Sequence, residues 1–222
     1  MQRKYPLVNN EIYHIISRSI AGYKIFNCDA NYQRFEDMLN FYQKQMPYSF
    51  SLFKRLSSKQ QNKILNTISS DVEDQSIQII AYCIMPTHIH LILKQLIDNG
   101  ISSFVANMLN SYSRYFNTLH DRKGPLWEGK FKNIHIDSDE QLLHLTRYIH
   151  LNPTSAGLVK EQDKWKYSSY KEFITKNKKN ICHFQDVLEI DPLTYKEFVN
   201  NRVGYQKEIS KIKSLILEDY TG

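Results

Sequence analysis

The sequence has few cysteines, no long apolar stretch, and neither internal repeats nor low-complexity tracts. Its three cysteines, Cys28, Cys83 and Cys182, are widely separated and odd in number, and no pair has zinc-ribbon spacing. This pattern excludes a disulfide scaffold and is typical of reduced thiols in the cytoplasm. No run approaches the roughly 20 apolar residues that span a bilayer. Residues 1–14 contain no apolar stretch of signal-peptide length, so we expect a cytoplasmic protein with no membrane partner.

What the chain does have is enough apolar material for a core and an excess of positive charge. It has 222 residues, of which 41% are hydrophobic and 13% aromatic, which predicts one domain or one domain with an appended tail. Lys and Arg outnumber Asp and Glu by 29 to 23, and the pI is about 9.0. A basic balance favours nucleic acid as a partner. The abundance of Lys, Asn, Ile and Tyr is equally typical of an AT-rich genome, so charge alone does not decide.

Hydrophobic periodicity predicts strands over 11–19, 77–86, 88–95 and 126–136, and helices over 31–45, 101–119 and 139–151. We expect a short helix and a loop over 48–75, an end of the third helix at Asn152-Pro153, and a final helix near 205–219. The order indicates an α+β fold: a ferredoxin-like or RRM-like antiparallel sheet with helices packed on one face, plus a helical C-terminal extension. We predict a catalytic domain over 1–160 and an extension of unassigned role over 161–222.

The strongest local signal is His88-Ile89-His90, inside an apolar predicted strand directly after Pro86-Thr87. Side chains two apart on a strand point to the same face, so both imidazoles project together. Neighbouring neutral imidazoles are natural ligands of a divalent metal. For an isolated pair, two polar residues on the wet face of a sheet are the commoner explanation.

A second signal lies on the helix predicted over 139–151. Tyr148 and Asn152 are four residues apart and share a helix face if the last turn stays helical, although a residue before proline resists that conformation. Asn152 can offer an amide oxygen to a hard cation, beside the phenol of Tyr148. Without the histidines, a half-buried amphipathic tyrosine and a helix-ending asparagine explain the pair equally well.

Several motifs together resemble the single-tyrosine transposases of the His-hydrophobe-His nuclease superfamily, in particular the REP-associated, IS200-like branch. The matching stretches cover most of residues 11–170 in the expected order, whereas 171–222 are not covered. They are YHIISRSIAGYKIF (13–26), AYCIMPTHIHLIL (81–93), SYSRYFNTLHDRKGPLWEGKFKN (111–133), RYIHLNPTSAGLV (147–159) and WKYSSY (165–170).

The resemblance implies roles for individual residues. His88 and His90 match the paired metal-binding histidines, Tyr148 matches the nucleophile, and Asn152 matches the position of a third ligand. It further implies Mg²⁺ or Mn²⁺ as cofactor and single-stranded DNA with a nearby hairpin as partner, with a homodimer as a frequent assembly. Tyr148 would attack a phosphodiester to form a 5′-phosphotyrosine and release a 3′-OH, which allows strands to be rejoined. Tyr112 and Tyr115 are rival nucleophiles by residue type, and we interpret them as core or base-stacking residues.

Basic and aromatic residues next to these motifs are candidates for DNA contact. Arg and Lys neutralise phosphates, and exposed aromatic rings stack on unpaired bases. Alternatively, the basic residues are solvated surface and the aromatic residues belong to the core. Arg147 suits either a phosphate contact or bracing of its helix. The predicted DNA-binding residues are Arg18, Lys24, Arg114, Arg122, Lys123, Trp127, Lys130, Lys132 and Arg147.

Two other functions share part of this pattern. A hairpin-binding protein or nickase without transposition would use the same His88, His90 and Tyr148. A zinc hydrolase built on the two histidines would require a third His, Asp or Glu and an open water position. Its spare candidates are His14, His135, His144 and His150, none at a diagnostic spacing.

Overall fold

The structure, a computed structural model, describes residues 6–44, 46–67, 75–175 and 181–201. Strands and helices alternate in the order expected for a βαββαβ core followed by further helices. The elements are β1 (Ile12–Arg18), η1 (Ile20–Gly22), α1 (Asp29–Tyr42), α2 (Phe50–Phe53), α3 (Ser58–Thr67), β2 (Ile77–Ile84), β3 (His88–Gln95), α4 (Gly100–Leu119), β4 (Lys132–His135), α5 (Asp139–Ser155), η3 (Gln162–Lys164), α6 (Tyr170–Ile174) and α7 (Pro192–Asn200).

The four strands form one antiparallel sheet in the order β2-β3-β1-β4. This is the strand order of a ferredoxin-like core, and it confirms the predicted fold class. Strand β3 lies between two partners, so its backbone is hydrogen-bonded on both sides. Its register with β1 pairs Ile16 with His90 and Arg18 with His88, which puts these four side chains on the same face of the sheet.

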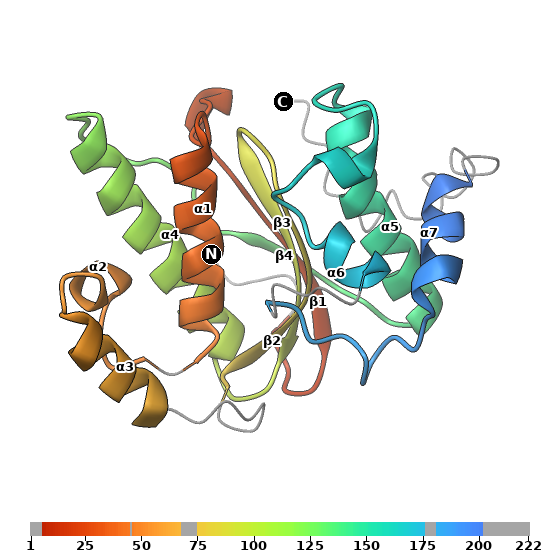
Figure 1. Cartoon of the computed structure of the whole chain (residues 1–222), viewed down its shortest axis with the longest axis horizontal. Helices are drawn as coiled ribbons and strands as arrows, with labels where there is room; N and C mark the ends of the chain where they lie inside the picture. The colour runs from red at the N-terminus through yellow and green to blue at the C-terminus, as the bar shows by residue number, and fades with distance from the viewer. Residues whose placement is uncertain (1–5, 45, 68–74, 176–180, 202–222) are drawn as a thin grey trace.

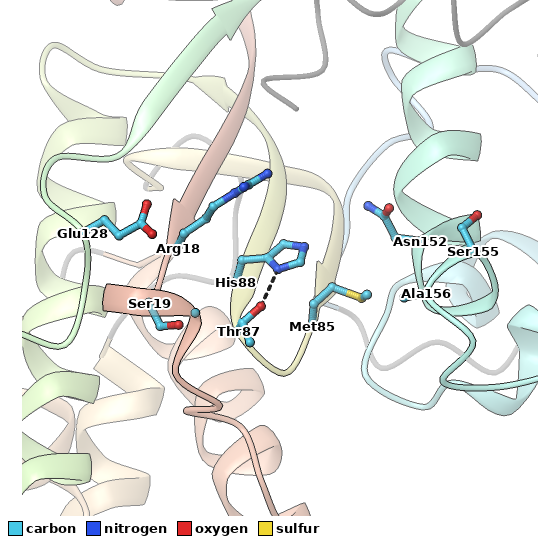
Figure 2. Close-up of a pocket in the computed structure, with 10 residues that line it drawn as sticks. Arg18, Ser19, Met85, Thr87, His88, Glu128, Asn152, Ser155 and Ala156 are labelled. Carbon is cyan, nitrogen blue, oxygen red and sulfur yellow. Dashed lines mark hydrogen bonds between the residues drawn. The ribbon is translucent and has the colours of Figure 1, made fainter. Parts of the chain in front are cut away.

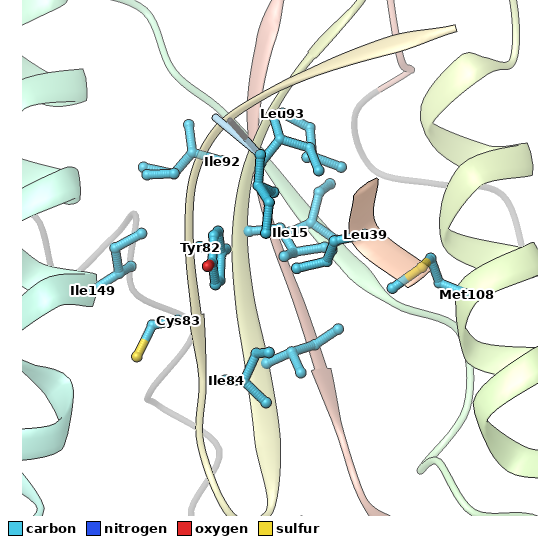
Figure 3. Packing of buried hydrophobic residues seen from close by; sticks show 14 of the residues in the cluster. Ile15, Leu39, Tyr82, Cys83, Ile84, Ile92, Leu93, Met108 and Ile149 are labelled. Atoms are coloured by element: carbon cyan, nitrogen blue, oxygen red, sulfur yellow. The ribbon is translucent and has the colours of Figure 1, made fainter. Parts of the chain in front are cut away.

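Helices cover both faces of the sheet (Figure 1). Helices α1 and α4 lie on one face and α5 with α6 and α7 lies on the other, so the prediction that the helices pack on a single face is wrong for α5. The core follows the alternation of the strands. Leu93 and Ile15 pack toward Leu39 and Met108 of the α1/α4 layer, while Ile149 of α5 lies on the opposite side (Figure 3).

Helix α4 begins against the sheet at the predicted break Asn99-Gly100. Asn99 has a positive φ of 60°, and Gly100 lies so close to β2 that a Cβ there would come within 2.2 Å of the Ser76 carbonyl oxygen. Only glycine allows this approach.

Two predicted boundaries are wrong. The strand expected over 126–136 is only four residues long, because Gly124 and Gly129 have φ values of +96° and +148° and turn the preceding segment. Helix α5 does not end at Asn152-Pro153 but continues to Ser155. Its end comes at Gly157, where φ is +69° and the Leu158 amide donates to the Pro153 carbonyl at 2.9 Å.

Among the described residues after 160, Tyr167, Ser169 and His183 lie along the outer edge of β2. The Ile84 amide donates to the Tyr167 carbonyl at 2.9 Å, and the Ser169 amide donates to the Tyr82 carbonyl at 3.0 Å. Further along, the His183 amide donates to the Ile79 carbonyl at 2.8 Å. The helix predicted near 205–219 lies outside the described residues. Among the helices described, none is long and apolar enough to cross a membrane.

Candidate active site

The paired histidines lie side by side on β3 as the alternation predicted. Their ring centroids are 5.0 Å apart and the rings are nearly perpendicular, at 84°. His90 is buried and His88 is partly buried. Burial lowers the pKa of His88 to about 4, and the positive charge of Arg18 acts in the same direction. Burial also lowers the pKa of His90 well below its usual value. Both rings are therefore neutral at pH 7, the form that binds a metal.

Each imidazole uses its Nδ1 in a hydrogen bond. His88 Nδ1 lies 2.9 Å from the Thr87 hydroxyl, and His90 Nδ1 lies 3.1 Å from Nε2 of His14. When these Nδ1 atoms carry the proton, Nε2 of each ring on β3 keeps its lone pair.

The sequence offered His14 only as a spare ligand of a zinc hydrolase, and the structure places it beside His90. It is fully buried on β1, and its ring stacks on His90 with centroids 5.3 Å apart and an angle of 14°. The signal that could have found it is its position in the strand over 11–19, on the same side as Ile16. The register that brings it to His90 is not readable from the sequence.

Tyr148 of α5 lies against this histidine pair. Its ring is 5.9 Å from that of His90, at 88°, and the side chain is only 3% exposed. Both residues belong to the same chain, so no partner subunit is needed to bring the phenol to the imidazoles.

Asn152 lies one turn further along α5 and is 9% exposed. Its Nδ2 is buried without a hydrogen-bond partner. A rotation of χ2 exchanges Nδ2 and Oδ1, so the amide can present either atom. Because α5 stays helical past Pro153, Tyr148 and Asn152 share a face as the four-residue spacing requires.

A pocket of about 420 Å³ separates β3 from α5 (Figure 2). His88 and Arg18 line it from the sheet and Asn152 lines it from the helix, with Glu128 at its side. Two neutral imidazoles and a buried amide without a partner at Nδ2 form a donor set that fits a divalent cation. Within the residues that the structure describes, no three His, Cys, Asp or Glu side chains could hold a metal together, so a zinc hydrolase gains no third ligand here.

Two further hollows continue from this pocket. The first, of about 230 Å³, shares Arg18 and Glu128 with it and adds Lys130 and Lys132. The second, of about 670 Å³, shares Lys130 and is lined by Trp127 and apolar side chains. Four of the predicted DNA-binding residues therefore border a chain of adjoining hollows that begins at His88.

The other predicted DNA-binding residues lie elsewhere. Lys24 and Lys123 are exposed outside these hollows. Arg122 donates to the Asn117 side chain at 3.1 Å and to the Pro125 carbonyl at 2.8 Å, which fixes the turn after α4. Arg114 is exposed on α4.

Arg147 and the rival tyrosines have structural contacts. Arg147 is 3% exposed, donates to the Asn201 carbonyl and lies over the Phe198 ring, the contacts expected of a residue that braces its helix. Tyr112 is fully buried and donates to the Ile25 carbonyl at 2.7 Å. Tyr115 is partly buried on α4, on the far side of the sheet from the histidines.

Comparison with known proteins supports the resemblance carried by the motifs. The family model described as "Transposase IS200 like" matches residues 48–152. The chain is 28% identical over 120 residues to a protein of Haemophilus influenzae described as a REP-associated tyrosine transposase, across 49% of this chain and 68% of that protein. Residues 48–152 thus match the IS200-like transposases, as the motifs predicted, and both similarities are to enzymes.

The structural match is to the REP-associated branch. The structure of a REP-associated tyrosine transposase bound to a REP hairpin superposes with a TM-score of 0.54 at 17% identity, over 86% of this chain and 96% of that chain. This match shows the common fold. A transposase structure from Deinococcus radiodurans covers 67% of this chain and 95% of its own, at 14% identity and a TM-score of 0.37.

Proposed function

We propose that the protein cleaves and rejoins single-stranded, hairpin-bearing DNA through a 5′-phosphotyrosine on Tyr148. The observation that carries this proposal is the convergence of the His88, His90 and Tyr148 rings, from β3 and α5, with the Asn152 amide one helical turn away. The hairpin in the structure of the REP-associated relative supports the choice of DNA substrate.

In this proposal His88, His90 and Asn152 would hold Mg²⁺ or Mn²⁺. When bound, a divalent cation neutralises charge on the non-bridging oxygens of a phosphodiester. The protein's own part is to supply two uncharged imidazoles and to keep them in place on a strand that is paired on both sides. The pocket beside His88 is large enough to admit a phosphate.

Tyr148 acts as the nucleophile. Its phenol loses a proton, the new bond forms between Tyr148 Oη and phosphorus, and the P–O3′ bond breaks. The departing 3′ oxygen takes up a proton and leaves as a 3′-OH. The energy of the phosphodiester is kept in the tyrosine ester, so another 3′-OH can reverse the step and join strands.

The adjoining hollows supply a path for the strand. Arg18, Lys130 and Lys132 would neutralise successive phosphates along the pocket and the first of the two hollows. The second hollow, lined by Trp127, offers apolar surface for an unpaired base. This arrangement supports single-stranded rather than fully paired DNA at the cleavage position.

The first test is covalent capture. We expect a hairpin-bearing oligonucleotide with Mg²⁺ or Mn²⁺ to give a denaturant-resistant adduct that maps to Tyr148. Tyr148→Phe removes the nucleophilic oxygen and abolishes the adduct, while DNA affinity changes by no more than about twofold, since only a single uncharged hydroxyl is removed. Denaturing gels and an equilibrium binding assay measure the two effects.

Tyr115→Phe is the matched control, because it removes the hydroxyl of a rival nucleophile and keeps the adduct. An adduct that persists in Tyr148→Phe contradicts the mechanism. Binding without any adduct in the wild type favours a hairpin-binding protein instead.

The cytoplasmic location, the homodimer and the division at residue 160 stay predictions.

A further inference from the structure

A separate cavity, of about 530 Å³, lies on the opposite side of the sheet from the histidines, where α2 meets the α1/α4 layer (Figure 1). Side chains from three helices and the turn after α2 line it. They are Arg34, Ser51, Lys54, Arg55, Arg114 and Tyr115, with Thr118 and Leu119 at the rim.

All charged side chains that line this cavity are positive. Four of its lining residues are Arg or Lys and none is Asp or Glu. In the described part of the chain, none of these four cations forms an ion pair. Clustered like charges repel one another, and a polyanion removes that cost when it binds.

Arg34 is held in place before any ligand arrives. Its guanidinium lies 4.2 Å from the centroid of the Tyr115 ring and 5.1 Å from that of Phe50, and Nη2 donates to the Ser51 hydroxyl at 3.0 Å. Its Nε is buried with no hydrogen-bond partner. A guanidinium that is already held in position is suited to an oxyanion.

Two of the four cations in this cavity, Lys54 and Arg55, come from a segment that a ferredoxin-like core does not need. A ferredoxin-like core needs a single helix between its first two strands, whereas this chain inserts α2 and α3 after α1. Ser49 caps α2 through the Leu52 amide, and Lys54 and Arg55 follow directly at its end. The insertion thus presents two exposed cations to Arg34 and Arg114.

We propose that this cavity binds backbone phosphates of duplex DNA outside the strand held at Tyr148. Four cations exceed the charge of one phosphate and suit several consecutive ones. The rings of Tyr115 and Phe50 are covered by Arg34, so they serve the guanidinium rather than an unpaired base. The choice of DNA rests on the proposed function, and it identifies the α2 insertion as a second DNA contact.

The test uses the full chain with Lys54 and Arg55, both exposed, changed together to Gln. We expect the slope of log Kd against log salt for a hairpin with a long duplex stem to fall by about 0.9 for each phosphate that the variant no longer neutralises. Adduct formation on a short unpaired oligonucleotide stays at the wild-type level. Lys160→Gln with Lys196→Gln removes the same charge elsewhere on the exposed surface and keeps the wild-type slope.

An unchanged slope in the Lys54/Arg55 variant overturns the proposal. If inorganic phosphate at matched ionic strength competes with the duplex stem equally well, the cavity binds a free anion. If the variant is defective only in binding anionic lipid vesicles, the cavity binds a membrane. Either outcome also overturns the proposal. Absence of the adduct in the wild type, with the slope difference intact, would instead contradict only the mechanism at Tyr148.

Discussion

At the scale of single residues, His14 is the side chain whose role depends most on the fold. Its Nε2 lies 3.1 Å from Nδ1 of His90, so the tautomer of His14 is coupled to the choice of the His90 nitrogen that carries the proton. Partners of this kind orient a metal ligand, and their removal typically lowers metal affinity about 10- to 100-fold.

We therefore expect His14→Leu, which fills the buried position with an apolar side chain, to weaken Mn²⁺ binding by about 10- to 100-fold. Titration calorimetry measures the affinity, and a thermal melt checks that the variant is folded. His14→Gln retains a polar partner for His90 and recovers part of the affinity. His120→Gln, at an exposed site, serves as control. Wild-type affinity in His14→Leu would refute the role.

Residue identities could be predicted only where the signal is local. His88 and His90 are two apart on one strand, so their shared face follows from the alternation. His14 and His90 are 76 positions apart, and no local pattern gives the register between them. Lys54 and Arg55 were missed because the segment over 48–75 is polar and poorly periodic. Arg34 lies in the helix predicted over 31–45, and only the tertiary fold brings it close to Arg55 and Arg114.

At the scale of elements, the start of α4 is the most constrained junction. A methyl group at Gly100 would meet the Ser76 carbonyl oxygen at 2.2 Å, and that oxygen belongs to the backbone beside β2. The neighbouring backbone cannot rotate out of the way as a side chain would.

Gly100→Ala should accordingly lower the free energy of unfolding by about 1–3 kcal/mol, the usual cost of overpacking. Urea denaturation provides the measurement. Ser103→Ala, an exposed change in the same first turn, leaves stability within about 0.5 kcal/mol. A Gly100→Ala variant as stable as the wild type would mean that α4 can shift away from β2 freely.

Element ends were harder to predict than element types. Pro153 suggested an end to α5 because proline lacks an amide proton and disfavours the helical form before it. Tertiary packing overrides this local preference. Residues Thr146 to Pro153 are all buried, and the helix ends only at Gly157. The short β4 follows from backbone turns at Gly124 and Gly129 that a count of apolar residues does not detect.

At the scale of the whole molecule, His150 joins α5 to the C-terminal segment. It is fully buried, with Nδ1 2.7 Å from the Tyr195 hydroxyl and Nε2 2.7 Å from Ser169 Oγ. Burial lowers the pKa of His150 to about 3. The unfolded chain binds a proton at this residue near its ordinary pKa of about 6.5 and the folded protein does not, so stability falls as the pH drops below that value.

Between pH 7 and pH 5 we expect the wild type, with metal removed by a chelator, to lose about 2 kcal/mol more stability than His150→Gln. Urea unfolding at both pH values measures the difference, in which the contributions of other groups cancel. His120→Gln lacks only an exposed imidazole and keeps the wild-type loss of stability. Equal losses in wild type and His150→Gln would show that His150 takes up its proton in the folded state.

The order of elements predicted the overall fold because βαββαβ has few compact solutions. The layer formed by α5, α6 and α7 was not predicted, since nothing in the local pattern of 139–151 says which face of the sheet it covers. Packing of the described residues beyond 160 against β2 depends partly on backbone hydrogen bonds, and these carry no side-chain signature.

The two margins of the sheet differ in what they offer to a second molecule. Along β2, the amides and carbonyls that would recruit another strand are partly taken by Tyr167, Ser169 and His183 of the same chain. Along β4, the available run is four residues long and includes Lys132, features that discourage strand addition. Self-association by extending the sheet is therefore disfavoured at both margins in the described part of the chain, and two copies would have to meet through helices or through a shared DNA.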